Sequence, residues 1–118
     1  NEIAPRPHNS GHWTIEGAYT SQFEQHLRAV TGRPLGTTDQ RAPTVTANVL
    51  GGVDSARDAT LAGIDRALAA DRLSMHWYGK REVYPLRKMG HVTGGADGES
   101  RDQLLASVRA VRDGFRFQ

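Results

Sequence analysis

The stretch PTVTANVL, residues 43–50, decides the fold class, because apolar and polar side chains alternate along it. Valine or alanine stands at positions 45, 47 and 49, and threonine or asparagine stands at positions 44, 46 and 48. Successive side chains of an extended chain point to opposite faces, so this period of two predicts a β-strand. The pair Gly51-Gly52 marks the end of the strand.

Two further segments have the character of strands. LSMHWYG, residues 73–79, alternates Leu, Met and Trp with Ser, His and Tyr. A partner strand is expected near residues 88–93, beyond a turn that contains Pro85. The two segments would pair in the manner of a β-hairpin.

Two helices are predicted from capping boxes, in which an N-cap serine is followed three residues later by glutamate or glutamine. Ser21 opens a helix over about 21–31, and Gly32 is placed to end it. Ser100 opens a helix over about 100–114, with four leucines and valines on its inner side.

The remaining segments divide into one more helix and two irregular stretches. Aliphatic residues at 61, 64 and 68 would share one helical face, which predicts a helix over about 56–70. Residues 1–20 and 33–42 follow neither period and are expected to be irregular or extended. Helices and strands mixed in this order indicate an α+β fold.

Composition narrows the classes of function. The chain has 118 residues, 37% of them hydrophobic and 24% charged, which suits one small globular unit. A net charge of +2 is weak support for a nucleic-acid partner, and none is expected. The absence of cysteine excludes disulfides and thiolate metal sites. No apolar run approaches the roughly 18 residues of a membrane span, so no membrane partner is expected. A cytoplasmic location is expected instead.

Residues 1–14, NEIAPRPHNSGHWT, are dense in polar and conformationally restricted residues and form the first candidate site. Arg6 and His8 stand two apart in an extended segment, so both can point to one side. With Asn9 they would make a small anion pocket of one planar cation and two neutral donors. A plain loop stays open as the alternative interpretation.

The same segment contains two kinds of possible metal ligand. Asn1 and Glu2 offer oxygen donors of the kind that suits Mg²⁺ shared with nucleotide phosphates. His8 and His12 are four residues apart, which would suit zinc on a helix, but Pro7 argues against a helix there. The isolated histidines elsewhere, His26 and His76, are interpreted as a helix-surface residue and a residue on the polar face of a strand.

The second candidate site is the basic turn HWYGKREVYPLRKMGH, residues 76–91. Lys80 and Arg87 flank the turn at Pro85, and a hairpin could bring both cations over one phosphate. An exposed basic turn without a ligand is the alternative.

Taken together, NEIAPRPHNSGHWT, then TSQFEQHLRAVTGRPLG (20–36), then HWYGK and RKMGHVT resemble the C-terminal part of the 5-(carboxyamino)imidazole ribonucleotide synthase family. These are ATP-grasp ligases of purine biosynthesis. The resemblance implies the end of an ATP-grasp domain over 1–36, followed over 37–118 by a small β-rich domain similar to a rudiment single hybrid fold. It also implies that the chain is a C-terminal piece of a longer enzyme, homodimeric when intact and inactive when isolated.

The resemblance further implies a reaction and its residues. ATP and bicarbonate would give carboxyphosphate, which carboxylates aminoimidazole ribonucleotide and leaves ADP and phosphate. By similarity, Asn1 and Glu2 belong to the ATP site, with Glu2 as a Mg²⁺ ligand. The three residues of the anion pocket, Arg6, His8 and Asn9, would act on bicarbonate and carboxyphosphate.

Lys80 and Arg87 match the family positions that hold the ribonucleotide phosphate. The basic turn departs from the family pattern Arg-Pro-Gly-Arg-Lys, because Tyr84 and Leu86 replace its first arginine and its glycine. This departure puts the contact of Arg87 in doubt. Two other functions stay open: another ATP-grasp ligase that forms an acyl phosphate, and a binding module for a phosphorylated ligand without turnover.

Overall fold

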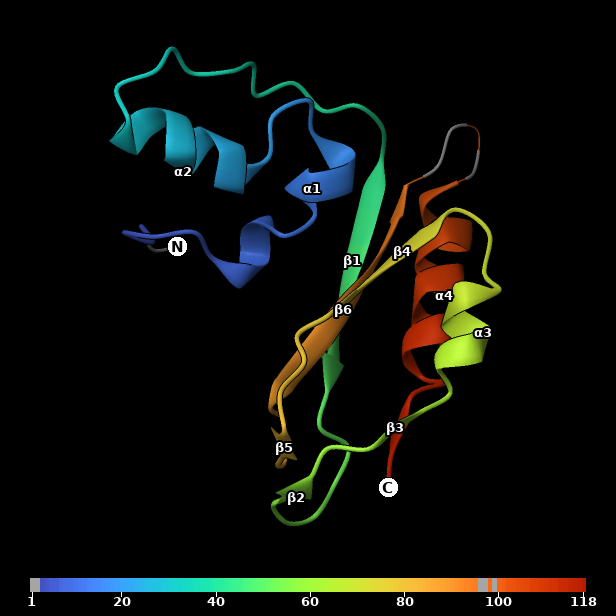
Figure 1. Ribbon diagram of the computed structural model, residues 1–118. Helices are drawn as coiled ribbons and strands as arrows, with labels where there is room; N and C mark the ends of the chain where they lie inside the picture. The colour runs from blue at the N-terminus through green and yellow to red at the C-terminus, as the bar shows by residue number, and fades with distance from the viewer. Residues whose placement is uncertain (1–2, 96–97, 99) are drawn as a thin grey trace.

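The computed structural model describes residues 3–95, 98 and 100–118, and its centre is a three-stranded antiparallel sheet (Figure 1). The strand order is β1-β6-β4, so β6 is the central strand. Its members are β1 (Thr44–Leu50), β4 (Leu73–Trp77) and β6 (Lys88–Gly95). The two strands predicted from side-chain alternation are confirmed, as are the partner strand expected near 88–93 and its antiparallel pairing with β4.

The register gives the sheet one apolar and one polar face. Ala47 of β1 lies opposite Val92 of β6, which lies opposite Met75 of β4. In the next row, Asn48 and His76 flank the central His91 in the same way. Because side chains alternate along each strand, these two rows point to opposite sides of the sheet.

Helix α4 (Arg101–Arg112) covers the apolar face, as Figure 1 shows in red, with the short α3 (Ile64–Leu68) beside it. Ser100 and Gln103 form the predicted capping box, in which each side chain bonds the backbone of the other. The core that results is made of residues from both layers: Val49, Val53, Ala67, Val83, Met89, Val92, Leu104, Val108, Val111, Phe115 and Phe117. None of the helices in the described part of the chain is long and apolar enough to cross a membrane.

The helix predicted over 56–70 is wrong except for α3. The segment before it pairs twice as a short strand, β2 (Arg57–Asp58) with β5 (Glu82–Val83) and β3 (Leu61–Ala62) with β7 (Arg116–Phe117). Gly63 stands between β3 and α3 and has a left-handed φ of 87°, so the helix does not extend back into the strand. Leu61 packs on the core from the strand, so tertiary pairing overrides the helical spacing.

The N-terminal segment lies on the other side of the sheet, against its polar face (Figure 1). It contains a 3₁₀ turn (Asn9–Gly11), the single-turn α1 (Thr14–Gly17) and α2 (Gln22–Val30). The expectation of an irregular segment over 1–20 therefore missed two short helical turns. Thr14 stabilises their junction by donating from Oγ1 to the Gly11 carbonyl at 2.6 Å.

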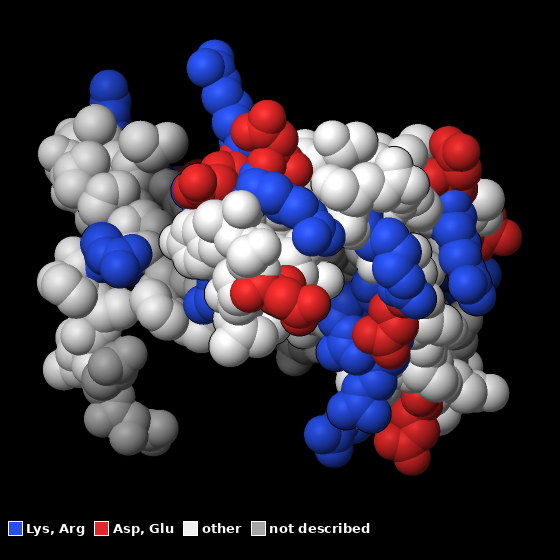
Figure 2. Space-filling model, turned by 90° about the horizontal axis from the view of Figure 1, so that it is seen from below, with Lys and Arg blue, Asp and Glu red and all other residues white. Residues whose placement is uncertain are grey.

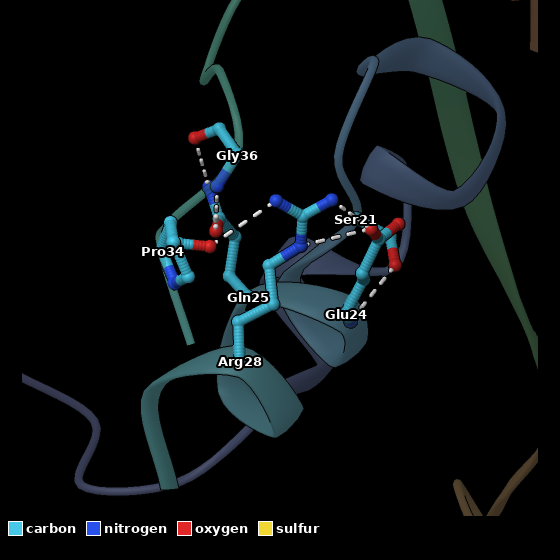
Figure 3. Close-up of polar contacts among 6 residues, drawn as sticks. All are labelled: Ser21, Glu24, Gln25, Arg28, Pro34 and Gly36. Atoms are coloured by element: carbon cyan, nitrogen blue, oxygen red, sulfur yellow. Dashed lines mark hydrogen bonds and ion pairs between the residues drawn. The ribbon is translucent and has the colours of Figure 1, made fainter. Parts of the chain in front are cut away.

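Helix α2 confirms the predicted helix over 21–31, including its end at Gly32, which has a φ of 66°. Ser21 accepts from the Glu24 backbone as expected, but the Glu24 carboxylate turns to Arg28 instead of the N-cap, as Figure 3 shows. Gln25 exchanges hydrogen bonds of 2.7 and 3.0 Å with the Gly36 backbone and holds the following loop on the helix (Figure 3).

Candidate functional site

A cluster of aromatic and imidazole rings fills the junction between the N-terminal segment and the polar face of the sheet. His76 stacks on His91 with ring centroids 4.4 Å apart and planes at 14°. His12, from the N-terminal segment, lies 4.7 Å from the His91 ring and meets the Tyr78 ring edge-on. His12 is thus 64 or more positions away in the chain from the sheet residues of this cluster. His91 lies at the centre of the cluster and is only 2% exposed.

Two hydrogen bonds anchor this ring cluster. The Tyr78 hydroxyl bonds His91 Nδ1 at 2.7 Å, and His76 Nε2 bonds Glu16 Oε1 at 2.5 Å. Within the described part of the chain, His91 Nε2 and Glu16 Oε2 are buried without a hydrogen-bond partner. The cluster therefore contains two buried polar atoms that the protein side chains around them leave unsatisfied.

Burial decides the charge of these imidazoles. It lowers the pKa of His91 to about 4, with smaller contributions from the neighbouring His76 and His12. It also lowers the pKa of His12, chiefly by desolvation. His91 is therefore neutral at pH 7, and its bond to Tyr78 joins two neutral groups.

Asn9 is the predicted site residue that contacts the sheet directly. Its amide donates to Asn48 Oδ1 at 2.8 Å, and Asn48 returns a hydrogen bond of 3.2 Å to Asn9 Oδ1. Asn48 stands on β1 directly opposite His91, so Asn9 borders the ring cluster. This reciprocal amide pair fixes the orientation of the Asn9 side chain.

The other predicted members of the anion pocket make separate local contacts. The His8 ring bonds the Ser10 hydroxyl at 2.9 Å, and the His8 backbone is held at both ends by the Gln22 side chain. Arg6 is exposed and donates to the Pro7 carbonyl at 3.4 Å. Among the described residues no hydrogen bond joins the three pocket members to one another.

The predicted nucleotide and metal ligands, Asn1 and Glu2, lie outside the described residues. Within residues 3–95, 98 and 100–118, no three histidine or acidic side chains stand close enough to hold a metal ion. The imidazole of His12 faces the ring cluster, and that of His8 bonds Ser10. The arrangement of this pair gives the zinc alternative no support.

The basic turn brings its cations close together. The Lys80 ammonium lies 5.5 Å from the Tyr78 ring centre and donates to the Lys88 carbonyl. Burial, together with the positive charges of Arg87 and Lys88, lowers the pKa of Lys80. The repulsion from Arg87 and Lys88 indicates that positive charge gathers near Lys80 in this hairpin. The binding of one phosphate by Lys80 and Arg87 together stays a prediction.

Arg87 is held on the turn itself. Its guanidinium lies 4.8 Å from the Tyr84 ring centre and bonds the Glu82 carbonyl at 2.7 Å. Leu86 has a left-handed φ of 62°, and the Arg87 amide bonds the Tyr84 carbonyl across the turn. Because a type II turn requires positive φ at this position, the glycine of the family pattern would fit it better than leucine.

Figure 2 views the molecule from the end at which β2 and β5 lie. Basic side chains gather over the sheet region there, with acidic ones among them, and the N-terminal region carries few charges on this face. The mixture of signs argues for a local anion site rather than a long basic surface.

The sequence predicted the basic turn and Asn9 but missed the ring cluster. Alternation does place Asn48, His76 and Tyr78 on the polar face of the sheet, and His26 is exposed as expected. The missing information was the cover of that face by the N-terminal segment, since periodicity within one strand contains no signal for a distant partner.

Comparison with known families first defines the class of protein. The ATP-grasp domain family matches residues 1–23. The family described as the phosphoribosylaminoimidazole carboxylase C-terminal domain matches residues 44–106, more than half of the chain. The chain therefore belongs to the phosphoribosylaminoimidazole carboxylase C-terminal domain family, and the predicted resemblance and α+β class are confirmed. The predicted domain boundary between residues 36 and 37 stays a prediction.

Individual relatives agree over almost the whole chain. The N5-carboxyaminoimidazole ribonucleotide synthase of Aquifex aeolicus is 45% identical over 111 residues, which cover 94% of this chain and 28% of that protein. The crystal structure of the Thermotoga maritima synthetase superposes with a TM-score of 0.88 at 46% identity, covering 98% of this chain and 32% of that one. The chain thus spans less than a third of the length of these relatives.

One similar structure contains ligands. The Aspergillus clavatus synthase, in complex with ADP and 5-aminoimidazole ribonucleotide, matches with a TM-score of 0.73 at 33% identity. The match covers 92% of this chain and 28% of that protein.

Proposed function

We propose that this chain forms the C-terminal part of an ATP-grasp ligase that carboxylates 5-aminoimidazole ribonucleotide with bicarbonate. ATP is consumed to ADP and phosphate, and carboxyphosphate is the intermediate. The observation that carries the proposal is the contact of Asn9, from the part that matches ATP-grasp, with Asn48 of the sheet, whose strand β4 leads into the turn that contains Lys80. A phosphorylated acceptor and an activated carboxylate would then meet across one sheet face.

The N-terminal side of the site would hold the bicarbonate and its phosphorylated form. Arg6 is exposed and keeps only a weak local contact, so its guanidinium can turn to a dianion. His8 and Asn9 supply further polar groups, since Gln22 holds the His8 backbone and Asn48 holds the Asn9 side chain. Such preorganised donors stabilise charge that develops during acyl-phosphate formation.

The nucleotide side of the site would begin at Asn1 and Glu2. A carboxylate is the ligand type that Mg²⁺ prefers, and the described residues offer no complete set of ligands, so further ligands must come from elsewhere in the protein. Bound Mg²⁺ would supply neutralisation of the phosphate charge. The role of this chain there is to present the Glu2 carboxylate beside the anion pocket.

Lys80 and Arg87 would bind the ribonucleotide phosphate. Burial, and after it the positive charges of Arg87 and Lys88, disfavour the charged form of Lys80 and lower its pKa. A phosphate dianion between them would relieve this repulsion. Arg87 would exchange its bond to the Glu82 carbonyl for the phosphate.

The test is ATP turnover by the full-length protein, measured as ADP release with bicarbonate and aminoimidazole ribonucleotide. We expect ADP release that depends on the ribonucleotide, and none from the 118-residue chain alone. ADP release that requires a different acceptor would support another ATP-grasp ligase instead.

A second candidate function is a module that binds a phosphorylated ligand without turnover. The gathering of Lys80, Arg87 and Lys88 in one turn of this chain favours it specifically. Tight ribonucleotide binding by the full-length protein without ADP release would support this alternative. We further propose that the enzyme works in the cytoplasm as a homodimer, which sedimentation of the full-length protein would test.

A further inference from the structure

A series of neighbouring residues runs across the polar face of the sheet. It starts at Asn9, which exchanges hydrogen bonds with Asn48, and Asn48 stands opposite His91 in the β1–β6 ladder. His91 bonds the Tyr78 hydroxyl at 2.7 Å. The series ends at Lys80, whose ammonium lies over the Tyr78 ring. It therefore joins the two parts of the candidate site.

Tyr78 is the only member of this series that contacts both sides with one side chain. Its ring supports Lys80 at 5.5 Å by a cation–π contact. Its hydroxyl bonds His91 at 2.7 Å. Burial raises the pKa of Tyr78, and an interaction of the hydroxyl with the Asn9 side chain opposes this rise in part. Ring and hydroxyl thus serve different parts of the site.

We propose that Tyr78 is a positioning residue that couples the two parts of the site, its hydroxyl orienting Asn9 and its ring orienting Lys80. The proposal rests on the proposed function for the identity of the two ligands. It adds that the sheet orients the anion pocket, as well as the phosphate-binding cations.

The surroundings explain why a hydroxyl is needed at this position. His91 is buried, neutral and already has one nitrogen without a partner in the described residues. Removal of the Tyr78 hydroxyl would leave its second nitrogen unpaired too, which is costly in a buried site. The imidazole would then rotate or seek another partner, and the neighbouring Asn48–Asn9 pair would lose its fixed geometry.

The experiment compares Tyr78→Phe with Tyr78→Leu in the full-length enzyme. Tyr78→Phe keeps the ring, so we expect kcat to fall by about 10-fold or more while KM for the ribonucleotide stays within about 2-fold. Tyr78→Leu also removes the ring, so KM for the ribonucleotide should in addition rise by about 3-fold or more. A residue with only a structural role would not affect kcat and KM separately in this way.

Tyr19→Phe is the matched control. Tyr19 also has a cation over its ring, Arg41 at 5.8 Å, but it is 65% exposed and is not a member of the series. The control loses the same atom and should keep both constants within about 2-fold of the parent. Asn48→Ala removes the partner of Asn9 on the sheet. This variant should lower kcat without a comparable change in KM, as Tyr78→Phe does.

A normal kcat in Tyr78→Phe, or a loss confined to KM, would overturn the coupling. If the parent enzyme does not use the ribonucleotide at all, the proposed function fails, but the coupling through Tyr78 can still be tested. The test is then the side-chain amide and imidazole NMR signals of selectively labelled full-length protein. Tyr78→Phe should shift the signals of Asn9 and His91, and unchanged signals would overturn the proposal.

Discussion

The sheet region, residues 44–118, and the N-terminal region, residues 3–43, are held together in different ways. Every buried apolar residue of the described chain except Ala18 belongs to the sheet region. Helix α2 has no buried residue, and its apolar Leu27 and Val30 are 63% and 65% exposed. Apolar burial is the main stabilising contribution in folding, so stability is concentrated in the sheet region.

The N-terminal region is fixed mainly by directional polar contacts. Gln22 holds the His8 backbone, Asn48 holds Asn9, and His76 bonds Glu16. Each such bond contributes only about 0.5–1.5 kcal/mol net, but it requires a defined geometry. The region proposed to handle the reactive intermediate is therefore accurately placed by the sheet and only weakly stabilised by itself.

The largest expected effect comes from the same substitution made in both regions. Leu104→Ala removes a side chain that is 2% exposed in the core and should lower the free energy of unfolding by about 2–5 kcal/mol. Leu27→Ala changes an exposed residue of α2 and should stay within about 0.5 kcal/mol of the parent. Urea unfolding of both variants measures the difference.

A similar loss in both variants would show that α2 is buried against something in the full-length protein. The comparison of the two regions would then hold only for the part of the chain described.

The pH dependence of the free energy of unfolding tests the junction between the two regions. The pKa of His91 is about 4 in the folded protein and about 6.5 when unfolded, so the unfolded state binds more protons between these values. Stability should therefore fall as pH drops through this window. For His91 alone the loss between pH 7 and pH 5 is about 2 kcal/mol. Urea midpoints at the two pH values measure it.

His91→Gln should reduce this pH dependence, because the titrating group is gone. His26→Gln removes an exposed histidine of α2 and should leave the pH dependence of the parent unchanged. Equal slopes in all three proteins would mean that His91 does not titrate with the unfolding transition.

Prediction from sequence succeeded where local pattern and tertiary burial agree. Leu104, Val108 and Val111 of α4 lie in the core as their spacing predicts, and the strands alternate as expected. Leu105, also predicted to lie inside, is half-buried and does not belong to the core. It failed over residues 56–70, where the half-buried Leu61 packs on the core through the pairing of β3 with β7 instead of through a helical face. The pairing partner of Leu61 is Phe117, far away in the chain, and leaves no local signal.

The candidate site divides in the same way. Lys80 and Arg87 lie in one hairpin because a hairpin is a local structure that the sequence predicts, and their joint contact with a phosphate stays a prediction. The ring cluster around His91 needs two regions to meet, so the sequence identified its members only as polar-face residues. The family resemblance supplied the roles of the site residues, which stay predictions until variants are measured.

Backbone strain offers a smaller test with one position in each region. Leu86 and Gly32 both have left-handed φ, 62° and 66°. Leu86→Gly should raise the free energy of unfolding by up to about 1 kcal/mol, because it removes the steric cost of a side chain in that region. Gly32→Ala should cost a similar amount in α2, without the loss of a packing contact. Thermal unfolding of both variants gives the signs.

A destabilised Leu86→Gly variant would contradict this expectation. It would mean that the leucine side chain, although 75% exposed, has contacts that outweigh the strain.

The smallest expected effect compares the two N-caps. Ser100 and Ser21 each accept a hydrogen bond from the third residue of their helix, at 3.3 and 3.2 Å. Loss of such a cap typically costs about 1 kcal/mol of helix stability. Helix α4 packs on the core, so its unfolding is coupled to that of the sheet, and Ser100→Ala should lower the global free energy of unfolding by about that amount.

Helix α2 has no such coupling in the described chain, since none of its residues is buried. Ser21→Ala should therefore leave global unfolding within about 0.3 kcal/mol and instead increase local opening of α2. Urea unfolding measures the global effect, and amide hydrogen exchange of residues 22–30 measures the local one. Equal global losses in the two variants would show that α2 unfolds together with the sheet. The N-terminal region would then be part of one cooperative unit, held there by its polar contacts alone.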